Sequence, residues 1–243
     1  MNFNQRNVFR STKPQVSVEG VNSFATQVYG WMSIGLALTA FVAWFTFKTG
    51  LYIKLMPFWW VTAIGTFLIS MGMVSMLNRL SFTALAGMFL AYAGLQGIFF
   101  GCMLPGYAAA FGGQIIWAAF ATAALVYGIA IIYGVVTKSD LTSLGRILSV
   151  AMIGLIAITL FYVVLSMFMP VTKFTLIISY LGLIIFTGLT AYDANQIKKM
   201  SEQTDGYSLA SCKLSLVMAL KMYINVIMIF WYLLQIFSSS NRR

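Results

Sequence analysis

Residues 114–136 read QIIWAAFATAALVYGIAIIYGVV, a run of 23 residues without a charged side chain. As an α-helix this run is about 35 Å long, enough to cross the hydrocarbon core of a bilayer, which is about 30 Å thick. In lipid every backbone N–H and C=O group needs a partner within the protein, and a helix supplies those partners within one segment. Strands of a membrane barrel are about half as long and alternate in polarity, which this run does not. The stretch therefore predicts a transmembrane helix.

Six further apolar segments of similar length flank this run, at about 24–47, 57–77, 82–104, 144–169, 174–197 and 214–237. The connections 50–57, 105–113 and 169–173 contain Gly or Pro, which interrupt helices, and the longest loop, 198–213, is polar. Residues 97–101 read GIFFG, a spacing of small residues that lets membrane helices approach closely. The sequence predicts an all-α integral membrane protein with seven transmembrane helices over residues 21–237. Residues 1–20 form a polar cytoplasmic N-terminal tail in this interpretation, and 238–243 form a short C-terminal tail.

The composition excludes a soluble domain. Of the 243 residues, 60% are hydrophobic and only 8% are charged, whereas soluble domains carry roughly 25% charged residues. The net charge of +10 does not indicate nucleic-acid binding, because the basic residues fall singly between apolar runs and form no patch interleaved with aromatic residues.

The basic residues predict the orientation. Nine of them fall on the side of the N-terminus: Arg6, Arg10, Lys13, Arg79, Lys138, Arg146, Lys198, Lys199 and Lys213. Five fall on the other side: Lys48, Lys54, Lys173, Arg242 and Arg243. Because Lys and Arg accumulate in cytoplasmic loops, we expect a cytoplasmic N-terminus and, after seven crossings, an external C-terminus.

The residue types present argue against catalysis. The chain has no histidine, which removes HExxH metalloprotease sites, Ser-His-Asp triads and most zinc sites. An intramembrane aspartyl protease needs two aspartates within the membrane, and here only Asp193 qualifies. We therefore expect no catalytic residue, no enzyme activity and no bound cofactor.

Asp193 and Lys221 are charged residues that the predicted helices place within the membrane. Such residues are costly there and indicate function by default. Two alternatives remain open. Asp193 is only five residues from Lys198 and can be an interfacial carboxylate wetted by headgroups, while Lys221 can extend its ammonium to the cytoplasmic surface. Asn225, four residues after Lys221, lies on the same helical face, and Arg79 either completes this cluster or is an ordinary cytoplasmic basic residue.

Residues 191–197 read AYDANQI and end an apolar segment, and the final segment contains Ala219-Leu220-x-x-Tyr223. This pattern resembles the signature of the Bax inhibitor-1 family of transmembrane proteins, with Tyr192, Gln196 and Tyr223 as motif residues. The resemblance covers nearly the whole chain, including segment count and short loops. It implies a seven-helix fold with a central last helix, a pH-sensitive calcium leak, and a role in suppressing stress or cell death.

The resemblance also implies a site. In that family two aspartates on the last two helices share a proton at the cytoplasmic mouth, and a basic residue at the end of the second helix latches to the first aspartate. Asp193 matches the first aspartate and Arg79 matches the latch. The position of the second aspartate is occupied by Asn225, so this chain has only one carboxylate there. The implied pH sensor or gate comprises Asp193, Arg79, Asn225 and Lys221, with Asp193 as a transient Ca²⁺ ligand.

Two functions follow as expectations. The first is a cation leak or channel, in which one carboxylate and a few oxygens bind calcium or another cation transiently, because a stable Ca²⁺ site needs six to eight oxygen ligands. The second is a non-conducting interaction protein that modulates a membrane-bound protease or another membrane partner, as is thought of some bacterial members. The short tails favour a bacterial inner (plasma) membrane, with the lipid bilayer as the constant partner and no nucleic acid.

Overall fold

The computed structural model describes residues 18–166, 172–203 and 208–240. Most of the predicted tails, and residues 169–171 of one predicted connection, lie outside these ranges. The described chain forms the following helices: α1 (Val18–Lys48), α2 (Leu51–Leu55), the 3-10 helix η1 (Met56–Phe58), α3 (Trp59–Ser75), α4 (Phe82–Phe111), α5 (Gly113–Val136), α6 (Thr142–Ser166), α7 (Thr172–Gln203) and α8 (Leu209–Ser240).

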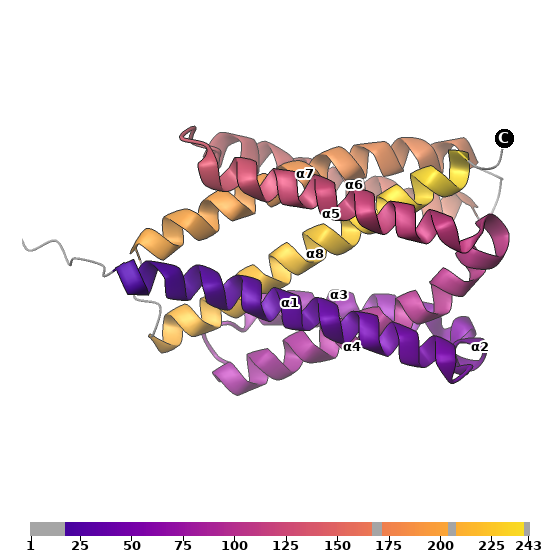
Figure 1. Cartoon of the computed structure of the whole chain (residues 1–243), viewed down its shortest axis with the longest axis horizontal. Helices are drawn as coiled ribbons and strands as arrows, with labels where there is room; N and C mark the ends of the chain where they lie inside the picture. Colours follow the sequence, from indigo (N-terminus) through magenta and orange to yellow (C-terminus); the bar gives the residue numbers. More distant parts are fainter. Residues whose placement is uncertain (1–17, 167–171, 204–207, 241–243) are drawn as a thin grey trace, which may run out of the picture.

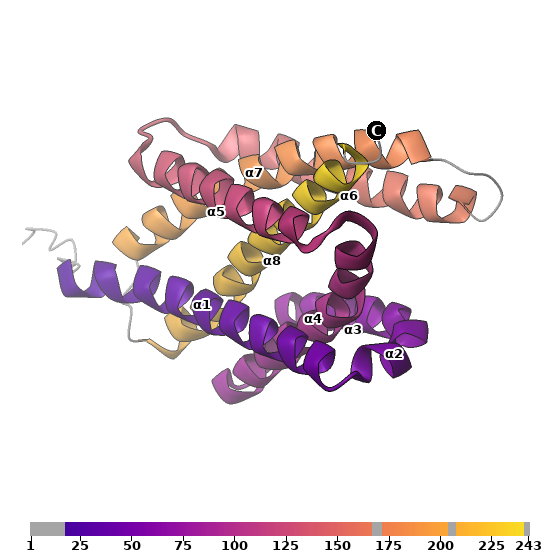
Figure 2. The same cartoon turned by 45° about the vertical axis from the view of Figure 1, so that its right-hand side comes forward.

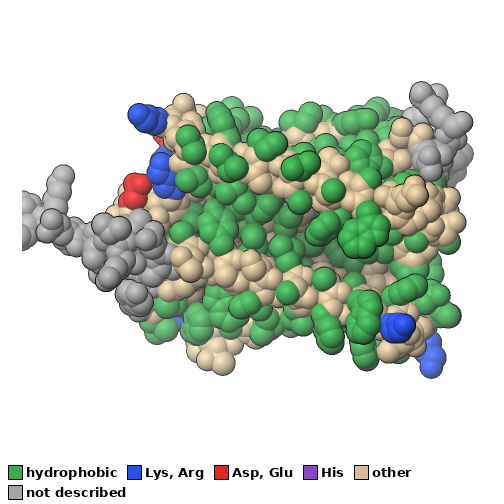
Figure 3. All heavy atoms as spheres, in the orientation of Figure 1, with side chains coloured by type: hydrophobic (Ala, Val, Ile, Leu, Met, Phe, Trp, Pro, Cys, Tyr) green, Lys and Arg blue, Asp and Glu red, His purple; other side chains and the backbone are tan. Residues whose placement is uncertain are grey.

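Seven helical stretches of the described chain are long and apolar enough to cross a membrane, with α2, η1 and α3 together making one of them. Figure 3 shows hydrophobic side chains covering the middle of the molecule, while Lys and Arg side chains gather at its two ends. This distribution suits a bilayer, where apolar side chains face lipid and charges lie in the aqueous regions. The predicted class, an all-α integral membrane protein with seven spans, is confirmed.

The last helix is the central one. In Figures 1 and 2, α8 crosses the molecule diagonally between a group formed by α1, α3 and α4 and a group formed by α5, α6 and α7. It contacts α7, α1, α5, α4 and α3. In its most apolar window 61% of residues are buried, compared with at most 39% for any other span. Five helices therefore pack around α8, which is the central helix, as predicted.

Three predicted connections are largely helical. Residues 51–58 form α2 and η1, and the predicted loop 198–213 is shortened because α7 runs to Gln203 and α8 begins at Leu209.

Residues 105–113 were expected to form a loop because Pro105 interrupts helices, but α4 continues through Pro105 to Phe111. A proline inside a helix lacks the N–H that would donate one hydrogen bond, and its ring crowds the carbonyl four residues earlier. Membrane helices nevertheless tolerate proline, because neighbouring groups can satisfy the backbone atoms that it leaves unpaired. The turn comes at Gly112, whose φ of +86° is a conformation that residues with a Cβ rarely adopt.

Small residues let the helices approach closely at two interfaces. A Cβ at Gly97 would lie 2.8 Å from the backbone oxygen of Thr39, so the G-x-x-x-G of α4 packs against α1 within the same chain. A Cβ at Gly134 on α5 would lie 2.2 Å from the backbone oxygen of Ala191 on α7. The second contact holds α7 in place immediately before Asp193.

Candidate functional site: a buried polar pair between α7 and α8

The centre of the site is a hydrogen bond between the two last helices. The side-chain amide Nδ2 of Asn225 on α8 donates to Oδ2 of Asp193 on α7 over 2.7 Å. Only 6% of Asp193 and 4% of Asn225 is exposed, so the carboxylate lies among helices and not on the headgroup-facing surface. It is ten residues before the end of α7 at Gln203, about 15 Å along the helix.

Two tyrosines from other helices lie near this pair. The hydroxyl of Tyr127 on α5 is 3.2 Å from the backbone oxygen of Met222 and 2.9 Å from Sδ of Met32. It also lies close to both Asp193 and Tyr29. The buried hydroxyl of Tyr29 on α1 has no hydrogen-bond partner among the described residues. Four helices thus contribute polar groups to one small region, but neither tyrosine was predicted, because tyrosine is common in membrane spans and carries no charge.

The motif residue Tyr223 has a packing role. It is fully buried, and its hydroxyl is 2.5 Å from Oγ1 of Thr39 on α1. Thr39 in turn donates to the backbone oxygen of Ala93 on α4, and the rings of Phe89 and Tyr92 meet Tyr223 edge to face. Tyr223 therefore fixes α8 against α1 and α4, on a different side of α8 from Asn225.

The other motif residues, Tyr192 and Gln196, do not join the buried pair. The Tyr192 ring fills the space over Gly145 of α6, where an added Cβ would lie 2.3 Å from a ring carbon. Gln196 is half-buried, and none of the described residues hydrogen bonds to its side chain. These two positions serve helix packing, and the polar chemistry of the motif resides in Asp193 and Asn195.

Asn195, which the sequence did not single out, clamps α7 to the end of α5. Its Nδ2 donates to the backbone oxygen of Gly134 over 3.0 Å, and the Nζ of Lys198 donates to the next oxygen, that of Val135, over 2.8 Å. These carbonyls lie in the last turn of α5, where a helix has no internal donors left. A positive charge is also favourable at this helix end. Because Asn195 is two residues from Asp193, the clamp fixes the position of the carboxylate.

Near the end of α7, Lys199 extends the same clamp to Asp140 in the turn between α5 and α6. Its Nζ lies 2.9 Å from Oδ1 of Asp140, and Asp140 also accepts hydrogen bonds from the backbone N–H and the hydroxyl of Thr142 at the start of α6. The hydrogen bond from Lys199, followed by those from Thr142, lowers the pKa of Asp140 to about 2. Both side chains are exposed, so the pair adds little stability.

The two remaining predicted site residues are exposed. Arg79 lies in the turn between α3 and α4, and within the described part of the chain the one ion pair is Lys199–Asp140. The structure therefore does not bring Arg79 to Asp193, and the latch stays a prediction. Lys221 is exposed on α8, one turn before Asn225, and its charge acts on Asp193 without forming an ion pair.

The site offers few metal ligands. Within the described residues, no group of three or more His, Cys, Asp or Glu side chains could hold a metal ion. Asp193 contributes one carboxylate and Asn225 one amide oxygen, against the six to eight oxygens that Ca²⁺ takes. These residues therefore suit transient binding of a cation better than a stable metal site.

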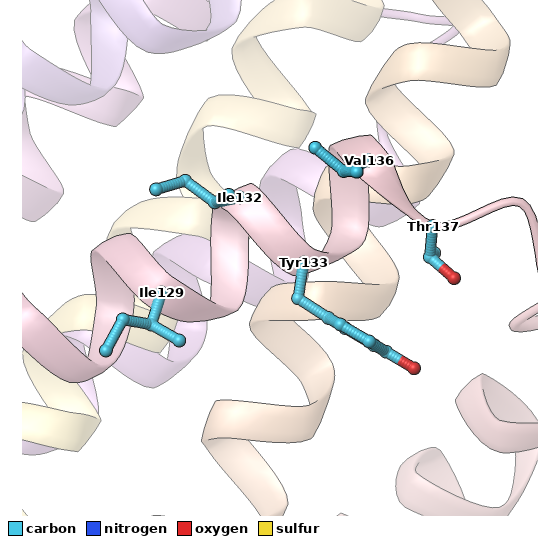
Figure 4. Close-up of a pocket in the computed structure, with 5 residues that line it drawn as sticks. All are labelled: Ile129, Ile132, Tyr133, Val136 and Thr137. Carbon is cyan, nitrogen blue, oxygen red and sulfur yellow. The ribbon is translucent and has the colours of Figure 1, made fainter.

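A shallow hollow of about 410 Å³ on the surface of α5 is not a functional site. Figure 4 shows that its lining side chains, among them Ile129, Ile132 and Tyr133, all project from α5 and its C-terminal end. Each of these three side chains is more than half exposed. This is the apolar surface that a membrane helix presents to lipid.

The fold defines a class, the polytopic helical membrane proteins, and in this chain a carboxylate and an amide are paired inside the helical bundle. Residues 21–242 match the family described as "Inhibitor of apoptosis-promoting Bax1". The chain belongs to this family, the Bax inhibitor-1 family, as the motif 191–197 predicted.

Two relatives illustrate the similarity. An uncharacterized protein of Chlamydia muridarum is 50% identical over 221 residues, which cover 91% of this chain and 93% of the relative. The inner membrane protein YbhL of Escherichia coli K12 is 33% identical over 229 residues, covering 92% and 94% of the two chains. With its seven apolar helices, the chain is a multi-pass protein of the inner membrane.

Proposed function

We propose that this protein is a cation leak or channel, with calcium as the preferred ion, whose cytoplasmic mouth is closed by the Asp193–Asn225 pair. The observation that carries the proposal is the 2.7 Å hydrogen bond that occupies one carboxylate oxygen of Asp193 inside the bundle. A carboxylate in surroundings of low dielectric constant interacts strongly with a cation. A cation that reaches Asp193 would compete with Asn225 for that oxygen.

The arrangement supports slow, controlled passage. One carboxylate and one amide oxygen bind a hard cation only briefly, which suits permeation because an ion must also leave. The exposed ammonium of Lys221 acts on Asp193 and repels cations at the same entrance, and the net charge of +10 acts in the same direction. A link to stress or cell-death control is part of the proposal and rests on the family alone.

The proposal includes no catalysis. A chain of 243 residues without histidine lacks the general base of most hydrolases. Asn225 stands where a second carboxylate would be needed for an aspartyl mechanism, and as an amide it neither donates nor accepts a catalytic proton.

Ion flux in proteoliposomes tests the proposal. We expect purified protein to raise Ca²⁺ entry above that of empty liposomes, and to raise K⁺ entry less, at pH 6, 7 and 8. Flux equal to that of empty liposomes, with co-purification of a membrane protease from native membranes, would instead support the alternative of a non-conducting interaction protein.

A further inference from the structure

One stripe along the central helix α8 is incompletely buried and carries an exposed lysine. Lys221 is exposed, and Ile224, Met228, Trp231 and Gln235 are each only partly buried. The intervals between these residues are three, four, three and four, so the side chains lie along one face of the helix. The stripe has a cation at one end and two apolar side chains followed by an indole in its middle.

A cavity opens beside the middle of this stripe. It has a volume of about 190 Å³, is partly open, and lies where α3, α4 and α8 meet. Its walls include Thr66 of α3, Gln96 and Phe99 of α4, and Met228 and Trp231 of α8. The centroids of the Phe99 and Trp231 rings are 5.3 Å apart. None of the described residues hydrogen bonds to the amide of Gln96, so this apolar cavity contains one free polar group.

The cation at the end of the stripe, Lys221, has no ion-pair partner among the described residues. Asp193 bonds to Asn225, and Asp140 bonds to Lys199. From Lys221 to Met228 is about 10 Å along α8, and from Lys221 to Trp231 about 15 Å. An occupant must therefore combine a negative charge with an apolar body about 10–15 Å away.

We propose that this stripe binds an anionic phospholipid, with its phosphate on Lys221 and an acyl chain in the cavity at Met228 and Trp231. A lipid phosphate near a membrane lysine is favoured electrostatically, and the acyl chain is favoured by burial of apolar surface. A second copy of this chain is a poorer occupant, because Asp193, the one described carboxylate near the depth of Lys221, is buried.

Native mass spectrometry of the purified full chain in detergent tests this assignment, with phosphatidylglycerol and phosphatidylcholine as probes. We expect phosphatidylglycerol to bind roughly fivefold more tightly, which corresponds to one lysine near an anionic headgroup. Lys221→Gln should abolish that preference. Lys138→Gln, which removes an exposed lysine at the same end but off α8, should preserve it.

A second variant tests the cavity separately from the charge. Ala63, which also lines the cavity, is exposed, so Ala63→Phe fills the space with little effect on the melting temperature. Ala63→Phe should weaken the binding of both lipids about equally and leave the ratio of their affinities unchanged. Equal binding of the two lipids to the wild type, an undiminished preference in Lys221→Gln, or a dimer that Ala63→Phe disrupts would each overturn the proposal. So would displacement of the lipid by inorganic phosphate alone.

Discussion

Asp193 and Asn225 were both predicted to belong to the site, because a carboxylate inside an apolar segment is conspicuous in a sequence. Tyr29, Tyr127 and Asn195 were not predicted. A tyrosine or asparagine in a span becomes informative only when its neighbours are known, and here those neighbours lie on α1, α5 and α8. Charged site residues can therefore be identified from the sequence. Which uncharged groups form hydrogen bonds around them depends on how the helices pack.

The substitution of asparagine for the second aspartate predicts a flat pH response. The wild-type pair has one carboxylate, so no proton is shared between two of them, and we expect ion flux to vary little from pH 6 to 8. In the double variant Asn225→Asp with Lys221→Ser, two carboxylates would lie within hydrogen-bond distance, where they cannot both ionise freely. Flux of that variant should change severalfold across this range, measured as Ca²⁺ entry into liposomes. A steep response of the wild type would contradict this explanation.

Among the helices, α5 and α7 are held together by a contact that tolerates no side chain at Gly134. Gly134→Ala places a Cβ 2.2 Å from a backbone oxygen that cannot rotate away, so we expect a loss of about 1–3 kcal/mol in the free energy of unfolding. Gly128→Ala on the same helix meets nothing within 4 Å and should be neutral or stabilising by up to about 1 kcal/mol. Unfolding in mixed detergent measures both, and equal stability of the two variants would contradict the predicted contact.

The contribution of the α5–α6 turn to the stability of the fold depends on pH only under acidic conditions. The pKa of Asp140 in the folded protein, about 2, lies below the ordinary aspartate value of 3.8. The Lys199–Asp140 pair therefore stabilises the fold above about pH 4 and loses this effect as the pH falls towards 2. Asp140→Asn should lower the melting temperature at pH 7 by at most about 3 °C, because the pair is exposed. The difference from the wild type should vanish near pH 2, and a difference that persists there would show that Asp140 acts through something other than its charge.

Helix positions were more predictable than helix ends. The apolar runs place all seven spans, because each run must be long enough for the bilayer. The continuation of α4 through Pro105 was not predictable, since proline normally indicates an end and only the surroundings decide whether a helix tolerates it. The extension of α7 to Gln203 depends likewise on contacts that Asn195 and Lys198 make with α5, a helix distant in sequence.

For the molecule as a whole, seven crossings place the two termini on opposite sides of the membrane. The described basic residues at the end where α1 begins include Arg79, Lys138 and Lys198, and we expect this end to be cytoplasmic. Alkaline phosphatase fused after Arg243 should therefore be active, and green fluorescent protein fused there should be dark. The opposite result would mean that one of the seven helices does not cross the membrane.

The central claim is that the Asp193 carboxylate controls cation passage, and Asp193→Asn tests it most directly. The amide at position 193 keeps an oxygen that Asn225 can donate to, so the fold should be retained while the negative charge is lost. Glu202→Gln, which removes an exposed carboxylate from the end of α7, serves as the matched control. In Ca²⁺ flux measurements on proteoliposomes we expect Asp193→Asn to reduce flux at least tenfold and Glu202→Gln to leave it within twofold of the wild type. Unchanged flux in a folded Asp193→Asn protein would contradict the claim.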